Sequence, residues 1–197
     1  MTTTDRSLTD KGVSTRDRIV AAARTMLLER GYEGLVLREL AQSLGITVGN
    51  LQYYFGTREA LALHVLDIES ARDAELITEQ RQLASPREAF RTVVHDMATR
   101  YRSESGHLLL MMTALAQHNL RFRDLIRASY AEFYPLFEAL IQDMNPGLSP
   151  TEASSRARLI NALVEGSAFQ VDLGDVDAFL HVVLAEAETI ALASPAR

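Results

Sequence analysis

The sequence predicts an all-α protein of about nine helices, with a small N-terminal helical domain followed by a larger helical domain. Apolar residues recur at helical spacing almost throughout, and no alternating strand pattern with hairpin turns is present. After two short helices the helical segments lengthen, which indicates a domain boundary near residue 62. At 197 residues the chain is long enough to bury a core in this two-part arrangement.

Composition excludes several classes of protein. The chain has no Cys, which rules out disulfides and thiol chemistry. The longest apolar run, Leu108–Ala116, is too short to cross a membrane, and no signal-peptide pattern is visible, so we expect a cytoplasmic protein. The net charge is −6, but residues 1–62 carry eight basic and seven acidic side chains. The acidity therefore lies in the C-terminal part, and a local N-terminal patch can still face phosphate.

The N-terminal part predicts three helices and the start of a fourth. Residues 1–13 are polar and aperiodic and are expected to form a flexible arm. A helix is predicted from about Thr15 to Arg30, followed by two short helices, Leu37–Leu44 and Val48–Tyr54. The tight glycine-containing turn between the short helices indicates a helix-turn-helix unit. The predicted caps and breaks are Ser14, Gly31, Gly45, Thr47, Gly56 and Thr57.

The C-terminal part predicts six longer helices. Two of them open with the same signal, a Ser-Pro pair followed by Glu three residues after the Ser, which is a capping box with Pro at the first helical position. The predicted helices are Arg58–Leu83, Pro86–Ser103, Leu108–Gln117, Arg123–Met144, Pro150–Val171 and Val176–Ala191.

Residues of the second short helix and its neighbours suit DNA recognition. The N-terminal turn of a recognition helix enters the major groove, where amides such as Asn50 and Gln52 pair with adenine edges. Gly49 permits close approach, and Arg58 donates to phosphate in the first turn of the next helix. Phe55 is assigned to the core. The expected DNA-binding residues are Arg38, Thr47, Val48, Gly49, Asn50, Gln52, Tyr53, Tyr54 and Arg58.

Residues 16–66 resemble the N-terminal domain of the tetracycline-repressor-like (TetR) family. The resemblance implies a helix-turn-helix domain over residues 14–62 and a ligand-binding and dimerisation domain over residues 63–197. It further implies a homodimeric repressor that binds a near-palindromic duplex operator and releases it when a small effector binds. The matching positions are Arg18-Ile19, Ala22-Ala23, Gly31-Tyr32, Arg38-Glu39-Leu40-Ala41, Gly45-Ile46-Thr47, Gly49, Leu51, Tyr54-Phe55 and Arg58-Glu59-Ala60-Leu61.

Three departures from the family pattern are visible. The hydroxyl residues usual before the second helix are replaced by Leu35 and Val36, so the side-chain cap of that helix is missing. The Tyr common after Leu51 is Gln52, which changes the bases that are read. The usual Lys is Arg58, which keeps the charge.

Aromatic residues and methionines concentrate in the middle of the C-terminal part. An apolar pocket with a few polar groups suits a small, largely apolar effector, and methionine lets such a pocket adapt. The alternative is that these residues form only the core. The candidate pocket residues are Phe90, Met97, Tyr101, His107, Met111, Met112, His118, Phe122, Tyr130, Phe133, Tyr134 and Phe137.

The last two predicted helices each carry an apolar stripe. Two such hairpins from two chains form a four-helix interface about a two-fold axis, and the resemblance places the dimer interface here. The alternative is packing of both stripes within one chain. The candidate interface residues are Leu159, Leu163, Gly166, Ser167, Val176, Phe179, Leu180, Val183 and Ala187.

No arrangement of residues indicates catalysis, a metal site or a cofactor. The histidines lack metal-ligand spacing, and neither a phosphate loop nor a nucleophile–base pair is visible. Two rival functions stay open. The first is an adaptor of the same fold that binds a protein instead of DNA, which the missing cap at Val36 favours. The second is an all-α enzyme, which no residue pattern supports.

Overall fold

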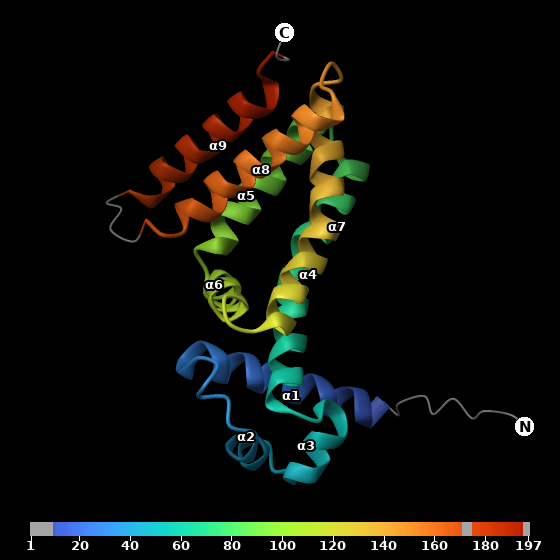
Figure 1. The fold of residues 1–197 in the computed structure, drawn as a ribbon, viewed down its shortest axis with the longest axis vertical. Coiled ribbons are helices and arrows are strands. Elements are labelled where there is room, and N and C mark those ends of the chain that lie inside the picture. Colours follow the sequence, from blue (N-terminus) through green and yellow to red (C-terminus); the bar gives the residue numbers. More distant parts are fainter. Residues whose placement is uncertain (1–9, 171–174, 195–197) are drawn as a thin grey trace, which may run out of the picture. The chain divides into compact units, whose positions relative to one another are not determined.

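The computed structural model describes residues 10–170 and 175–194, and over these ranges the chain forms nine α-helices and no strand (Figure 1). Among the described residues, no helix is both long enough and apolar enough to span a membrane. The helices are α1 (Asp10–Arg30), α2 (Leu37–Ser43), α3 (Val48–Phe55), α4 (Arg58–Leu83), α5 (Pro86–Tyr101), α6 (Glu104–Ala116), α7 (Leu120–Met144), α8 (Pro150–Ser167) and α9 (Val176–Leu192).

The chain divides into two compact units, residues 1–66 and 67–197. The N-terminal unit contains α1, α2, α3 and the first turns of α4. Its core is built from the stripes that the sequence predicts, with Ile19 and Leu27 of α1 and Leu40 of α2 fully buried. Helix α4 is continuous from Arg58 to Leu83, so its residues belong to both units.

Helix α1 begins earlier than predicted. It starts at Asp10 instead of Thr15, so Ser14 lies inside the helix and is not its N-cap. Residues 10–13 of the expected arm are therefore helical, and residues 1–9 lie outside the described part of the chain. Apolar periodicity marks only the packed part of a helix, which is why the polar first turn escaped prediction.

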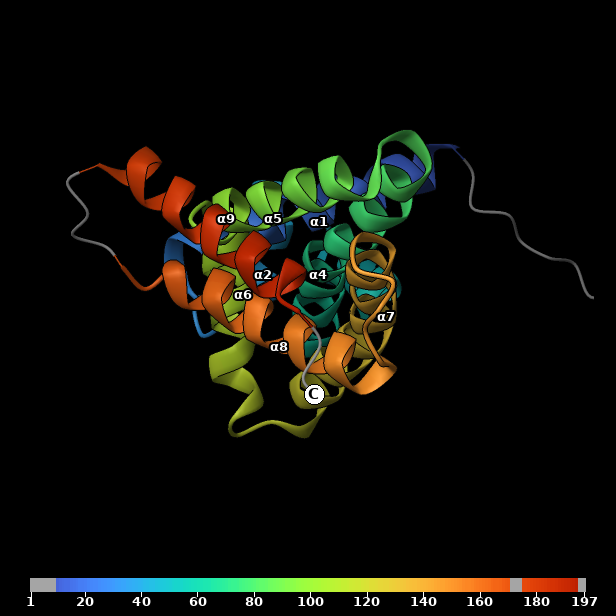
Figure 2. The same ribbon diagram turned by 90° about the horizontal axis from the view of Figure 1, so that it is seen from above.

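The C-terminal unit is a bundle of α5–α9 with the second part of α4. Helix α9 packs on α5 and α8, and α7 packs on α6 and α8 (Figures 1 and 2). Buried Glu188 of α9 accepts hydrogen bonds from Arg87 and Arg91 of α5, and these hydrogen bonds lower the pKa of its carboxyl. Both predicted capping boxes are present, at Ser85 and Ser149.

Other helix bounds differ from the predicted ones at their ends. Helix α6 starts at Glu104, before the predicted Leu108, because Ser103 caps it by accepting from the backbone N–H of Ser105. Asn119 caps α7 in the same way, so that helix begins at Leu120 and not at Arg123. Helix α8 ends at Ser167, short of the predicted end at residue 171, which lies outside the described part.

Gly106 of α6 lies against the backbone at the end of α5. A Cβ atom built at Gly106 would lie 1.9 Å from the carbonyl oxygen of Tyr101, which belongs to backbone and cannot rotate away. Gly106 is buried, and the turn between the two helices depends on this missing side chain. By contrast, a Cβ at Gly49 of α3 would meet only the Thr47 hydroxyl, at 4.0 Å.

Gly106→Ala should lower the free energy of unfolding by about 1–3 kcal/mol, because α6 must shift to admit the methyl group. Gly49→Ala is the matched control. It should leave stability unchanged or raise it by up to about 1 kcal/mol, since alanine costs less entropy in a helix. Urea unfolding followed by circular dichroism measures both variants. Equal stability of the two would contradict the close packing at Gly106.

Candidate functional site

The turn between α2 and α3 is fixed by backbone geometry and buried anchors. Gly45 has φ +67°, and nothing lies within 4 Å of its Cβ position, so glycine is required here for its conformation and not for space. The backbone N–H of Ile46 donates to the carbonyl of Ala41 at 3.0 Å and closes the turn. Leu51 and Phe55 are buried and hold α3 in place, which confirms the assignment of Phe55 to the core.

Helix α3 presents its polar residues to solvent. The Thr47 hydroxyl caps the helix by accepting from the backbone N–H of Asn50 at 3.1 Å. Asn50 and Gln52 are exposed, and Tyr53 is 73% exposed, an unusual degree for a tyrosine. Thr47 and Gly49 are also exposed, while Val48 and Tyr54 are half-buried. Four of the predicted contact residues on α3, Gly49, Asn50, Gln52 and Tyr53, are therefore accessible along the helix, and Val48 and Tyr54 are accessible only in part.

Arg58 lies in the first turn of α4 and is already engaged. Its guanidinium donates to the carboxylate of Glu33 at 3.1 Å and to the Glu33 carbonyl at 3.4 Å. It also lies over the ring of Tyr32, 4.4 Å from the ring centroid. Sequence reasoning treated this cation as available to phosphate. The structure shows that Nη1 of this guanidinium already donates to Glu33, and the role of Arg58 toward phosphate stays a prediction.

The N-terminus of α2 lacks a side-chain cap, as the sequence indicates. Val36 occupies the N-cap position in an extended conformation, with φ −99° and ψ 111°, and makes no capping hydrogen bond. It is 40% exposed. Arg38, in the first turn of the same helix, is exposed.

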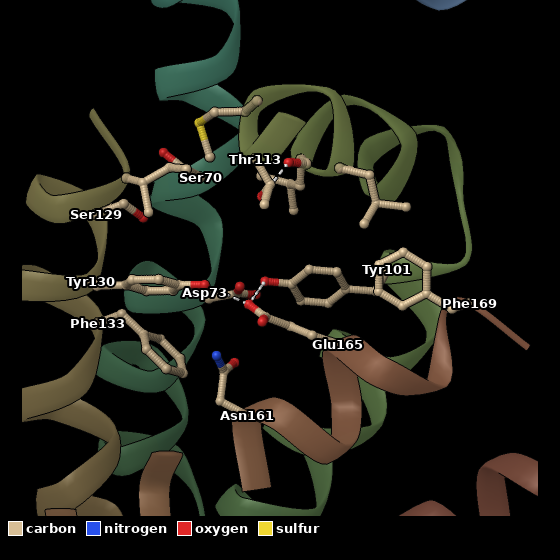
Figure 3. Close-up of a pocket in the computed structure, with 14 residues that line it drawn as sticks. Ser70, Asp73, Tyr101, Thr113, Ser129, Tyr130, Phe133, Asn161, Glu165 and Phe169 are labelled. Carbon is tan, nitrogen blue, oxygen red and sulfur yellow. Dashed lines mark hydrogen bonds between the residues drawn. The ribbon is translucent and has the colours of Figure 1, made fainter. Parts of the chain in front are cut away.

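The C-terminal unit encloses a pocket of about 140 Å³ (Figure 3). Residues of α4, α5, α6, α7 and α8 line it, together with Phe169, which follows α8. Most of its wall is apolar or aromatic, with carboxylates, hydroxyls and one amide among the rest. The lining residues are Ser70, Asp73, Tyr101, Leu109, Leu110, Met112, Thr113, Ile126, Ser129, Tyr130, Phe133, Asn161, Glu165 and Phe169.

A carboxylate held by two phenols lies in this pocket. The hydroxyls of Tyr101 and Tyr130 both donate to Oε1 of Glu165, at 3.1 Å and 2.8 Å (Figure 3). Burial raises the pKa of both tyrosines above the ordinary value, and the negative charge of Glu165 raises it further. Both phenols therefore stay protonated at neutral pH and keep donating.

A buried ion pair lies beside the pocket. Asp73 of α4 pairs with Arg100 of α5, and both side chains are almost fully buried. Arg100 also donates to the backbone carbonyl of Glu69 at 3.1 Å. Burial raises the pKa of Asp73, although Arg100 acts in the opposite direction. Across the pocket, the buried amide of Asn161 donates to the hydroxyl of Tyr134 at 3.3 Å.

Two family models match the chain. Residues 19–65 match the bacterial regulatory proteins of the tetR family. Residues 86–191, more than half of the chain, match the C-terminal domain of BetI-type transcriptional repressors. The chain belongs to the TetR family of transcriptional regulators.

Individual relatives are more distant. The repressor AcnR of Corynebacterium efficiens is 37% identical over 70 residues, which cover 36% of this chain and only 37% of AcnR. The regulator PksA of Bacillus subtilis is 23% identical over 185 residues, covering 89% of each protein. These alignments support common descent within the TetR family and do not show that the activities are shared.

Solved structures share the fold. A TetR regulator from Haloarcula marismortui has a TM-score of 0.75 at 20% identity, over 91% of this chain and 97% of that one. A regulator from Saccharomonospora viridis, solved in complex with choline, has a TM-score of 0.71 at 20% identity, over 89% of this chain and 94% of that one. At this identity the likeness shows the TetR fold alone.

The predicted effector residues of this TetR-family chain divide into those that line the pocket and those that do not. Tyr101, Met112, Tyr130 and Phe133 line it. The remaining eight need correction, because helical periodicity identifies an inward face and does not separate cavity wall from solid core. Phe90, Met97, Phe122 and Phe137 are fully buried core, Met111 and Tyr134 are half-buried outside the pocket, and His107 and His118 are exposed.

Sequence reasoning also missed ten lining residues, of which Asp73 left a signal together with its partner Arg100. Asp73 falls on the apolar stripe of α4 that contains Leu66 and Ile77, and Arg100 falls on the stripe of α5. Opposite charges inside two apolar stripes predict a buried pair. Among the described residues, no group of three or more His, Asp or Glu side chains is placed to hold a metal ion.

The predicted dimer residues of α8 and α9 fall into exposed, half-buried and buried groups. Leu159 is 60% exposed, and Gly166 and Val176 are exposed as well. Leu163, Phe179 and Leu180 are half-buried. Ser167, Val183 and Ala187 are buried within the chain, so they are corrected to intramolecular packing positions, since α9 packs on α5 and α8.

Val36→Thr should raise the free energy of unfolding by about 1 kcal/mol, because the new hydroxyl can cap an α2 amide from a backbone already in the N-cap conformation. Val36→Ala is the control, since it shortens the side chain without adding a hydroxyl. Urea unfolding of both variants gives the difference. If the threonine and alanine variants are equally stable, the missing cap does not limit α2.

Proposed function

We propose that this TetR-family chain is a homodimeric repressor that binds a near-palindromic operator and leaves it when a small molecule occupies the pocket of the C-terminal unit. The observation that carries the proposal is the polar, accessible surface of α3, held outward by the buried anchors Leu51 and Phe55. A helix of this kind enters the major groove by its N-terminal turn.

Specificity is proposed to come from α3. Asn50 and Gln52 carry amides that pair with the N6 and N7 edge of adenine, and both are exposed. Tyr53 offers a hydroxyl to phosphate or a ring face to a thymine methyl group. Gly49 lets the helix backbone approach the duplex, because no side chain stands in front of it. The proposed reading therefore favours operators with A·T pairs in each half-site.

Two copies are needed to read a palindrome. Recognition helices of a dimer sit about 34–36 Å apart, one turn of DNA. The exposed edge of α8 and α9, which includes Leu159 and Val176, is the proposed contact between the copies. Apolar side chains exposed along two adjacent helices favour burial against a second hairpin of the same kind.

Helix α4 is the proposed route from effector to DNA. It carries Arg58 in the N-terminal unit and the pocket residues Ser70 and Asp73 in the C-terminal unit. An effector changes operator affinity only if it binds the DNA-competent state and the released state unequally. The choline complex of the Saccharomonospora viridis relative, which is a different protein of the same fold, supports a small-molecule ligand for this unit.

An adaptor that binds a protein is the second candidate. Two observations favour it: the uncapped N-terminus of α2 at Val36, and the occupation of Arg58 by Glu33. Both reduce the number of groups free to meet phosphate.

Footprinting on the DNA flanking the chain's own gene, at two salt concentrations, separates the two candidates. The repressor should protect a near-palindrome, with affinity that falls steeply as salt rises, because bound phosphates release counterions. A folded dimer that protects nothing at low salt would support the adaptor. Addition of candidate effectors to the protected complex then tests release.

Arg58→Ala should weaken binding to all sequences and flatten the plot of log affinity against log salt by about one unit per half-site. Fluorescence anisotropy with a labelled operator measures the slope. Arg127→Ala removes an exposed arginine from the C-terminal unit and is the control, with the wild-type slope expected. An unchanged slope in the Arg58 variant would mean that the arginine serves only its contacts with Glu33 and Tyr32.

A further inference from the structure

The charge of the pocket has a definite sign. Asp73 and Glu165 are among its lining residues, whereas none of the fourteen lining side chains is Arg, Lys or His. Asp73 is matched by Arg100, which does not itself line the pocket. Among the described residues, Glu165 forms no ion pair, and its hydrogen-bond partners are two neutral phenols. The unmatched charge of the pocket is therefore negative and belongs to Glu165.

Glu165 is also held in place. Both phenols donate to the same oxygen, Oε1, from opposite sides of the pocket, and Figure 3 shows the carboxylate between the two rings. Tyr101 comes from α5 and Tyr130 from α7, so the carboxylate of α8 is fixed from two other helices. A carboxylate that is half-buried without a cation is costly, and two hydrogen bonds from neutral groups offset only part of that cost.

The walls around this carboxylate suit an organic group. Aromatic rings of Tyr101, Tyr130 and Phe133 lie near it, and Phe169 lines the pocket beyond Tyr101, with aliphatic side chains of α6 and α7 completing the wall (Figure 3). Faces of aromatic rings attract cations, and the attraction strengthens where water is excluded. A bare metal ion would need several oxygen or nitrogen ligands, and the described residues supply no such group.

We infer that the effector is an organic cation, an amine or ammonium compound with an apolar substituent. Its charge lies against Glu165 between Tyr101 and Tyr130, and its apolar part lies against the aliphatic and aromatic wall. The inference builds on the proposed function, because it names the chemistry of the ligand for the same pocket. It also refines the sequence-based expectation of a largely apolar effector by adding one positive charge.

Three probes that differ in charge and share a ring test this directly. They are 2-phenylethylammonium, 2-phenylethanol and phenylacetate, and calorimetric titration of the protein without DNA measures their binding. The ammonium compound should bind at least about tenfold more tightly than the alcohol, and the carboxylate least. Equal or tighter binding of the alcohol or the carboxylate would overturn the inference, as would no measurable binding of the ammonium compound.

Glu165→Gln locates the charge, because the amide keeps the size of the side chain and an acceptor for both phenols. This variant should bind the ammonium compound and the alcohol about equally. Glu138→Gln is the control, since that carboxylate accepts from Arg158 on the same unit, outside this pocket, and should keep the wild-type order. A Glu165 variant that retains the preference for the cation would overturn the inference.

Tyr130→Phe gives an independent readout if Glu165→Gln does not fold. It keeps the ring and removes one of the two hydrogen bonds that offset the carboxylate charge, so more of that charge is left for a cation and the preference for the ammonium compound should grow. A preference that falls or stays unchanged in this variant would show that the cation does not sit at Glu165.

Operator release is measured separately, by anisotropy with each probe. Cation binding without release would keep the assignment of the pocket and contradict the proposed response. If only an uncharged compound releases the operator, the proposed response to a small molecule holds and the assignment of a cation to the pocket is wrong.

Discussion

The C-terminal part of α4 depends on one buried ion pair. Arg100 of α5 reaches into the bundle, pairs with Asp73, and donates to the carbonyl of Glu69, so one side chain joins α5 to α4 at two points. Breaking a buried pair by removing one partner leaves the other charge uncompensated, at a cost of about 3–5 kcal/mol. The position of α4 within the C-terminal unit is thus specified by charge as well as by the packing of Ile77 and Ala74.

Helix α4, which this ion pair holds, contributes Ser70 and Asp73 to the wall of the proposed effector pocket and also has residues in both units. Asp73 is a pocket residue and an ion-pair partner at once, and fifteen positions earlier on α4 stands Arg58. A ligand that alters the surroundings of Asp73 acts on a helix whose first turn belongs to the DNA-binding unit. Helices transmit a shift along their axis because every residue is tied to the next turn by backbone hydrogen bonds. Ser70 and Asp73 are therefore located where a bound ligand could shift the position of α4.

Local signals made the N-terminal unit predictable, whereas the pocket was predictable only in part. Gly45, Thr47 and the buried anchors of α3 act within a few residues of each other, so their spacing alone defines the turn and the recognition helix. Phe90 and Tyr130 carry the same apolar periodicity, yet one is solid core and the other lines a cavity. That difference arises from how five helices pack together, and the apolar pattern of a single helix does not determine this packing. Glu165 was missed because its role depends on phenols supplied by two other helices.

The contact between Arg58 and Glu33 affects how strongly Arg58 can bind phosphate in the proposed DNA complex. An exposed carboxylate already accepts from one nitrogen of this arginine, so a phosphate that takes its place in the proposed complex gains less, because the pair is lost. Because the pair is exposed, its strength is small, and a backbone phosphate, which carries one negative charge on two equivalent non-bridging oxygens, can accept from the same guanidinium. Glu33 also adds a negative charge near the duplex in the proposed complex, which weakens binding to any sequence equally.

A regulator with weakened phosphate contacts relies more heavily on base contacts from α3, since its phosphate contacts alone hold it less firmly on arbitrary DNA. The missing cap at Val36 acts in the same direction. Under the proposed function both features lower non-specific affinity, and the proposed base contacts of Asn50, Gln52 and Tyr53 then decide where the chain binds.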